Sequence, residues 1–148
     1  MVGIDSPKIE DFLNEVCADL RVIREIAFLS RNDFLCDLKC RFAARYALVD
    51  AVGVSTLIGL RILGEKFDVQ PETYEEVFDL LAEFGVISLD VCNGMNRLVD
   101  LRNVIVNVCV EVDDLKIYNE VKKRGLHVIE EFVEEIEKYI SCSGVREH

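Results

Sequence analysis

The chain has few of the residues that interrupt helices and few of those that transfer protons. Its 148 residues include no tryptophan, two prolines, eight glycines and two histidines, His127 and His148. Because proline and glycine break helices, their scarcity predicts long ordered elements with few interruptions. Hydrophobic residues make up 51% of the chain, which is enough for a sizeable core. The length predicts one domain spanning residues 1–148.

Basic residues are also fewer than acidic ones. The chain has 17 basic and 28 acidic residues, a formal net charge of −11. This excess repels phosphate at long range and argues against broad nucleic-acid binding, although it leaves room for a small local basic site. The N-terminus shows no charged leader followed by an apolar region. The longest nearly apolar stretch, residues 47–60, is interrupted by Asp50, Ser55 and Thr56 and is too short for a membrane span. We therefore expect a cytoplasmic protein without membrane association.

The cysteines do not form a metal-binding pattern. There are six of them, with no Cys-x-x-Cys pair: Cys17, Cys36, Cys40, Cys92, Cys109 and Cys142. With only two histidines beside them, a zinc site is poorly supported, and we predict no metal and no cofactor. Small buried hydrophobic residues are the favoured interpretation. Disulfides are the minority interpretation, plausible mainly in a hyperthermophile.

Hydrophobic residues recur at helical spacing through most of the chain. The pattern predicts five helices, at about residues 6–29, 32–66, 73–84, 88–102 and 113–140. Candidate N-caps precede them: Ser6 before Pro7, Asn32 or Asp33, Thr73 with Glu76, Ser88, and Asp113 or Asp114. The β-branched run 104–112 could be taken for a strand, but no second candidate strand exists to pair with it. The fold class predicted is all-α, a five-helix antiparallel bundle.

One stretch carries a recognisable motif. Residues 102–109 read Arg-Asn-Val-Ile-Val-Asn-Val-Cys. They resemble the motif Arg-Asn, three residues, His, one residue, Tyr of the HepT-like proteins of the HEPN superfamily. The segments Tyr-Glu-Glu-Val-Phe at 74–78 and Gly-Val-Ile at 85–87 precede it at the family's spacing. The resemblance therefore extends over nearly the whole chain, while Asn107 and Cys109 replace the motif His and Tyr.

The resemblance implies a HEPN helical fold and a homodimer with its cleft at the subunit interface. It also implies a metal-independent ribonuclease toxin. The expected partner is a minimal nucleotidyltransferase antitoxin, which modifies the motif tyrosine. These expectations come from the family and not from composition or spacing.

The replaced residues matter for this chemistry. Cleaving RNA without metal requires a base, an acid and a cation that stabilises the phosphate oxygens. Arg102 can still hold a phosphate and Asn103 can orient it, but Asn107 cannot take a proton at neutral pH. Because proton transfer contributes roughly 10²–10⁴-fold in rate, little ribonuclease activity is predicted. Cys109 offers a thiol at the modification position, and neither histidine is placed to substitute for the missing one.

Geometry limits what this remnant can do. On an ideal helix Arg102 and Asn107 are about 140° apart, whereas Asn103 and Asn107 share a face. Arg102 and Asn107 could meet on one ligand only if the helix ends nearby or a second subunit contributes. Arg45 could extend an anion site formed by Arg102, Asn103 and Asn107, although a solvated helix face is the simpler interpretation. A structural role for Arg102, in an ion pair or a dimer contact, has equal weight.

Three hypotheses remain open at this point. The chain is an interaction protein that has lost catalysis but keeps its dimer and its nucleotidyltransferase partner. Alternatively, it is an active metal-independent endoribonuclease that uses a different base, in which case RNA is its substrate. The third possibility is a helical module that binds a nucleotide or another anion.

Overall fold

Seven helices form the regular structure of the described part of the chain. The structure is a computed structural model, and it describes residues 7–107 and 111–143. The helices are α1 (Pro7–Ala27), α2 (Arg31–Leu35), α3 (Leu38–Phe67), α4 (Tyr74–Glu83), α5 (Leu89–Val106), α6 (Asp114–Lys122) and α7 (Arg124–Ser143). No strand occurs within these residues, and 104–106 complete α5. The all-α prediction is confirmed, whereas the predicted number of five helices is wrong.

The first additional helix arises because the expected helix 32–66 is divided near its start. Ser30 caps the short α2, so Asn32 and Asp33 lie inside that helix and not before it. Asp37 has extended backbone angles, and its side chain accepts hydrogen bonds from two backbone N–H groups of α3, the nearer at 2.9 Å. Such a cap satisfies donors that an interrupted helix would leave open.

The second additional helix comes from a break in the expected helix 113–140. Lys123 leaves helical geometry with φ −133° and ψ −91°, and α7 begins at Arg124. A Cβ atom on Gly125 would lie 2.9 Å from the carbonyl oxygen of Glu120. Glycine therefore permits the close approach of the two helices at the break. The caps predicted at Thr73, Ser88 and Asp113 are confirmed, each with a side-chain oxygen accepting from the following turn.

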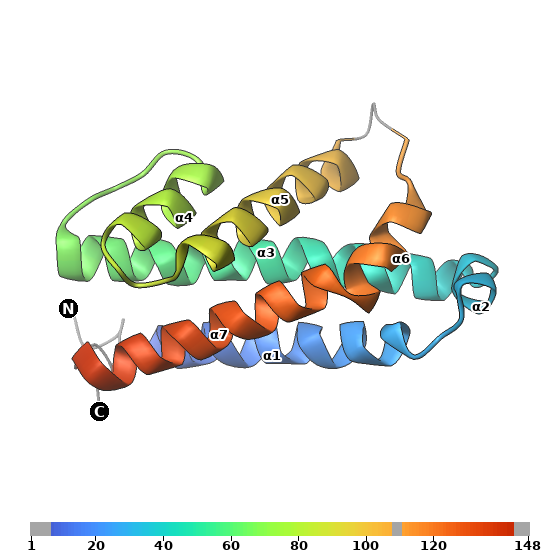
Figure 1. Ribbon diagram of the computed structural model, residues 1–148, viewed down its shortest axis with the longest axis horizontal. Helices are drawn as coiled ribbons and strands as arrows, with labels where there is room; N and C mark the ends of the chain where they lie inside the picture. Colours follow the sequence, from blue (N-terminus) through green and yellow to red (C-terminus); the bar gives the residue numbers. More distant parts are fainter. Residues whose placement is uncertain (1–6, 108–110, 144–148) are drawn as a thin grey trace.

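Helix α3 is the centre of the bundle (Figure 1). It lies beside α1, to which α2 joins it at one end, and α4 and α5 pack along another side. Helices α6 and α7 complete the core against α1 and α5. Gly59 allows α4 to pack closely, because a Cβ there would lie 2.5 Å from Val77 Cγ1. The core includes the fully buried Phe34, Phe78 and Phe132.

Helix α3 also has an apolar side that no described element covers. By length and composition alone it could cross a membrane, and 61% of its most apolar window is buried in the bundle. A core helix of a bundle passes the same test. Its exposed large hydrophobic residues include Phe42, Tyr46, Leu57 and Leu60.

Candidate functional site

The Arg-Asn pair of the motif lies in the last turns of α5. Arg102 is partly buried, and its guanidinium carbon lies 4.6 Å from the ring centroid of Tyr74, the first residue of α4. Arg102 Nη1 donates a hydrogen bond to Asn103 Oδ1 at 3.0 Å. Arg102 Nε is buried and has no hydrogen-bond partner among the described residues. The stacked ring and the amide thus orient the guanidinium, while its buried Nε–H is satisfied by no acceptor among the described residues.

Asn107 lies just outside this helix. It is the C-cap of α5 with extended backbone angles (φ −86°, ψ 107°), and its N–H donates to Val104 O at 3.3 Å. The helix therefore ends just before Asn107, which is the condition under which Arg102 and Asn107 could contact one ligand. Asn107 and Asn103 are both exposed. Cys109, the position that replaces the motif tyrosine, lies outside the described residues.

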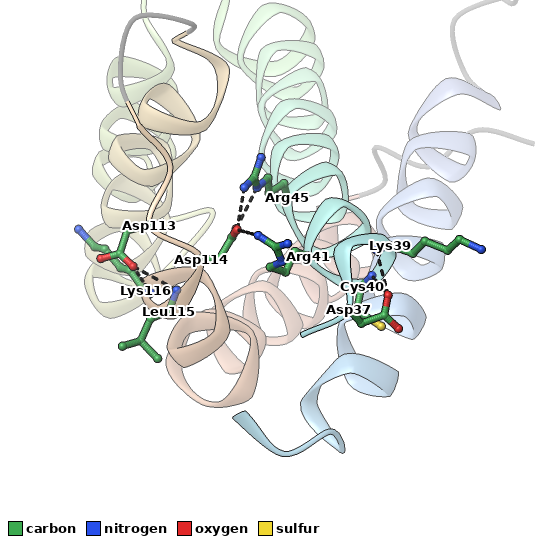
Figure 2. A network of polar contacts seen from close by, with 9 residues as sticks. All are labelled: Asp37, Lys39, Cys40, Arg41, Arg45, Asp113, Asp114, Leu115 and Lys116. Atoms are coloured by element: carbon green, nitrogen blue, oxygen red, sulfur yellow. Dashed lines mark hydrogen bonds and ion pairs between the residues drawn. The ribbon is translucent and has the colours of Figure 1, made fainter. Parts of the chain in front are cut away.

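Arg45 is engaged in an ion pair with Asp114 (Figure 2). Its Nε and Nη2 donate to the two carboxylate oxygens of Asp114 at 2.9 and 2.6 Å. Arg41 Nη1 donates to the same carboxylate at 3.3 Å. The hydrogen bond from Arg45 is the main cause that lowers the pKa of Asp114 below its ordinary value. Asp114 therefore already occupies most of the anion-binding capacity predicted for Arg45.

This ion pair fixes the far end of the connector that carries the motif. Asp114 is the first residue of α6, and Asp113 caps that helix through hydrogen bonds to the backbone N–H groups of Leu115 and Lys116. Figure 2 shows Arg41 and Arg45 of α3 pointing at Asp114. The chain that follows Asn107 is therefore anchored to α3 where it becomes helical again.

Neither histidine replaces the missing motif histidine within the described structure. The side chain of His127 is 73% exposed on α7, where its ring lies 3.6 Å from the Glu130 carboxylate. His148 lies outside the described residues. No group of three metal-ligating side chains occurs in the part of the chain that the structure describes. The five described cysteines are free thiols.

A second polar cluster lies between α1 and α3. Asp19 is 6% exposed, and burial together with a hydrogen bond to the Asp50 carboxyl raises the pKa of Asp19 to about 9. The same hydrogen-bonding to Asp50 raises the pKa of Glu15. Tyr46 donates from its hydroxyl to Asp50 Oδ1 at 3.5 Å. Asp19 Oδ2 and Asp50 Oδ2 are buried and receive no donor from the described residues. One of the two carboxyl groups must therefore keep its proton.

Sequence reasoning missed the partners that position the candidate residues. Tyr74 precedes Arg102 by 28 positions, and Asp114 follows Arg45 by 69. No local spacing connects residues so far apart. Helical periodicity could have indicated only that Asp19 lies on the buried side of α1.

The comparisons with known proteins place this arrangement in a family. The model of the family described as ribonuclease HepT-like matches residues 13–136. The chain belongs to the HepT-like family. The resemblance noted in the sequence is thereby confirmed. No curated protein matches the chain.

Solved structures similar to this HepT-like chain include toxins captured with their antitoxins. One is a tri-AMPylated HEPN toxin of Shewanella oneidensis in complex with an MNT antitoxin. It has a TM-score of 0.81 and 18% identity, over 88% of this chain and 97% of that one. A toxin–antitoxin structure with AMP-PNP has a TM-score of 0.78 and 19% identity, over 87% and 97%. YutE of Bacillus subtilis, a cytosolic protein of unknown function, has a TM-score of 0.78 and 18% identity, over 94% and 92%. At these identities the likeness establishes a shared fold.

Proposed function

We propose that this chain is a HepT-like protein of a toxin–antitoxin pair that no longer cleaves RNA. In this proposal it works in the cytoplasm as a homodimer whose partner is a minimal nucleotidyltransferase. The observation that carries the proposal is the site at the end of α5. Arg102 keeps its support from Tyr74 and Asn103, whereas the residue that follows the helix, Asn107, cannot transfer a proton.

The retained half of the site supports binding rather than catalysis. Arg102 carries a permanent charge and a fork of donors, one of which is used by Asn103. The ring of Tyr74 fixes the plane of the guanidinium, so little entropy is lost when an anion binds. A phosphate group of a nucleotide or of RNA fits these donors. Binding a nucleotide at Arg102 is the second candidate function, and the orientation of the guanidinium by Tyr74 and Asn103 favours it.

The partner is proposed from the family and from its solved relatives. The Shewanella oneidensis relative was captured with an MNT antitoxin, and this chain has the same fold. Cys109 does not offer the hydroxyl that a family antitoxin would modify. We therefore propose that the complex is held by surface contacts and does not depend on modification at position 109.

RNA cleavage decides between the proposal and an active enzyme. Purified protein is incubated with labelled single-stranded RNA and with tRNA, and the products are separated on denaturing gels. We expect intact RNA with the wild type and new cleavage with the double variant Asn107→His, Cys109→Tyr. Adding Arg102→Ala to that double variant should abolish the new cleavage. If the wild type cuts RNA and Arg102→Ala stops it, the chain is an active ribonuclease and the proposal is wrong.

Calorimetry with AMP and ADP tests binding at Arg102. We expect Arg102→Ala to weaken binding at least tenfold, which corresponds to about 1.4 kcal/mol. Arg24→Ala is the matched control, since Arg24 pairs with Glu130 on the α1–α7 surface. If both variants bind as the wild type does, or the wild type binds neither nucleotide, the second candidate function is excluded.

A further inference from the structure

Phe28 projects into solvent from the turn between α1 and α2. It is 90% exposed, the largest value for any large hydrophobic residue in the part of the chain that the structure describes. Its neighbours pack inward, since Ile26 is buried and Leu29 lies against the core. The exposure therefore belongs to this one position and not to the whole turn.

Hydrogen bonds from α6 hold the backbone on both sides of Phe28. Lys122 Nζ donates to the carbonyl oxygen of Ala27 at 3.0 Å. The hydroxyl of the buried Tyr118 donates to the carbonyl oxygen of Leu29 at 2.7 Å. Because both flanking carbonyls are fixed, the turn cannot rotate to bury the ring. A ligand that contacts Phe28 meets a ring already in place, so little backbone entropy is lost on binding.

Basic residues surround this ring, although the chain as a whole has a net charge of −11. The bond from Lys122 to Ala27 brings segments 21–31 and 122–124 side by side. Together these segments contain six basic residues and a single acidic one, Glu25. All six basic residues are exposed: Arg21, Arg24, Arg31, Lys122, Lys123 and Arg124. The end of α1 and the junction of α6 and α7 thus form a local basic surface.

Most of these cations have no carboxylate partner. Arg24 is the exception, because its guanidinium pairs with Glu130 of α7 at 2.9 Å. Lys122 is used to hold the turn. The other four form no ion pair within residues 7–107 and 111–143: Arg21, Arg31, Lys123 and Arg124. These four and Phe28 are here called the Phe28 surface.

A projecting aromatic ring among unpaired cations matches single-stranded nucleic acid. Such a strand offers a free base face that can stack on the ring, and phosphates that cations can hold on either side. Arginine suits these phosphates because its charge is permanent and its donors form a planar fork. The core of a protein–protein interface is, in contrast, depleted of charged residues. A double helix hides its base faces and could use only the cations.

We infer that the Phe28 surface binds single-stranded nucleic acid, with one base stacked on Phe28 and the flanking phosphates held by the unpaired cations. This surface is separate from the Arg102 site, since Figure 1 shows the ends of α1 and α5 on opposite sides of α3. Binding here requires no proton transfer and so does not depend on whether the chain cleaves RNA. Neither stacking nor phosphate pairing reads the 2′-hydroxyl, so RNA and DNA strands bind alike.

Substitutions of the exposed ring test the stacking. Binding is measured by fluorescence anisotropy with a labelled strand of about 12 nucleotides, either DNA or 2′-O-methyl RNA, which lacks the attacking hydroxyl. We expect Phe28→Ala and Phe28→Leu to weaken binding at least about fivefold, whereas Phe28→Tyr keeps it within about twofold of the wild type. A duplex of the same sequence should bind at least about fivefold more weakly. Tyr46→Ala, which removes another exposed aromatic ring on α3, is the matched control and should change nothing.

The salt dependence tests the cations. In the double variant Arg31→Ala, Lys123→Ala, the slope of log affinity against log salt should become less steep by about 0.7 for each lost phosphate contact. The matched control is Lys66→Ala with Lys138→Ala, which removes the same charge from exposed positions on α3 and α7. Its slope should equal that of the wild type.

Four results would overturn the inference. The wild type could bind neither strand at high micromolar concentration. Phe28→Leu could bind as tightly as the wild type, which would exclude stacking. Arg102→Ala could abolish binding that Phe28→Ala leaves intact, which would place the strand at the motif. Poly-glutamate could displace the strand at an equal concentration of charges, which would indicate an acidic protein as the ligand. Cleavage of unmodified RNA by the wild type would contradict the proposed function and leave this site standing.

Discussion

Removing the carboxylate of Asp114 should destabilise the protein, because this group attaches the connector after α5 to α3. In the variant Asp114→Asn, Arg45 loses a bidentate partner and Arg41 loses its hydrogen bond to the same group. The Asp114 side chain is 9% exposed, so little water replaces it. The two arginines keep 29% and 26% exposure, which screens their unpaired charge. Unpairing a buried charge costs about 3–5 kcal/mol, and with this screening we expect about 2–3 kcal/mol.

The pH dependence identifies the source of this loss. The pKa of Asp114 is lowered in the folded state relative to its unfolded value of about 3.9. The stabilisation is therefore complete above that unfolded value and disappears as the pH falls through the lower folded value. The free energies of unfolding of the wild type and of Asp114→Asn should differ by the full amount at pH 7 and converge progressively below about pH 4.

Urea unfolding followed by circular dichroism at 222 nm measures the effect, at one protein concentration for all variants. In thermal unfolding, 2–3 kcal/mol corresponds to a Tm lower by roughly 5–10 °C for a chain of this size. Asp113→Asn is the matched control, because asparagine caps a helix nearly as well as aspartate and the change should cost only a few tenths of a kcal/mol. A loss below about 0.5 kcal/mol at pH 7, or a loss of the same size at pH 3, would refute the reasoning.

Three further outcomes are expected. Since the pKa of Asp19 is about 9 in the folded state, stability is complete below about pH 4 and falls as the pH rises toward 9. The free energy of unfolding of Asp19→Asn should equal that of the wild type near pH 4.5 and exceed it by at least about 1 kcal/mol at pH 8. A difference that does not grow with pH would contradict the buried acid pair. Gly59→Ala should destabilise by about 1–3 kcal/mol because its Cβ meets α4, whereas Gly64→Ala should cost nothing in urea unfolding; equal effects would contradict the packing. Tyr74→Leu should weaken nucleotide binding at Arg102 about two- to fivefold by calorimetry, and unchanged binding would show that the ring does not orient the guanidinium.

Local signals were sufficient to predict an all-helical chain and the starts of α4, α5 and α6. Thr73, Ser88 and Asp113 cap as predicted because a cap depends on residues within one turn. The same local rule explains the error in counting helices. Asp37 is a good cap, but the apolar periodicity runs through it without interruption, as it does through Lys123. Only the packed structure shows that the helices are divided at both residues.

The sequence by itself determined the family and the loss of the motif histidine, because both depend on the order of residue types along the chain. It also predicted a helix that ends near Arg102, whereas the structure extends α5 to Val106 and makes Asn107 its C-cap. Tertiary structure decided what those residues touch. It set Arg102 on Tyr74, committed Arg45 to Asp114, and buried Asp19 against Asp50. These pairs join residues far apart in the chain, and their partners are selected by the packing of helices against α3, which no local pattern encodes.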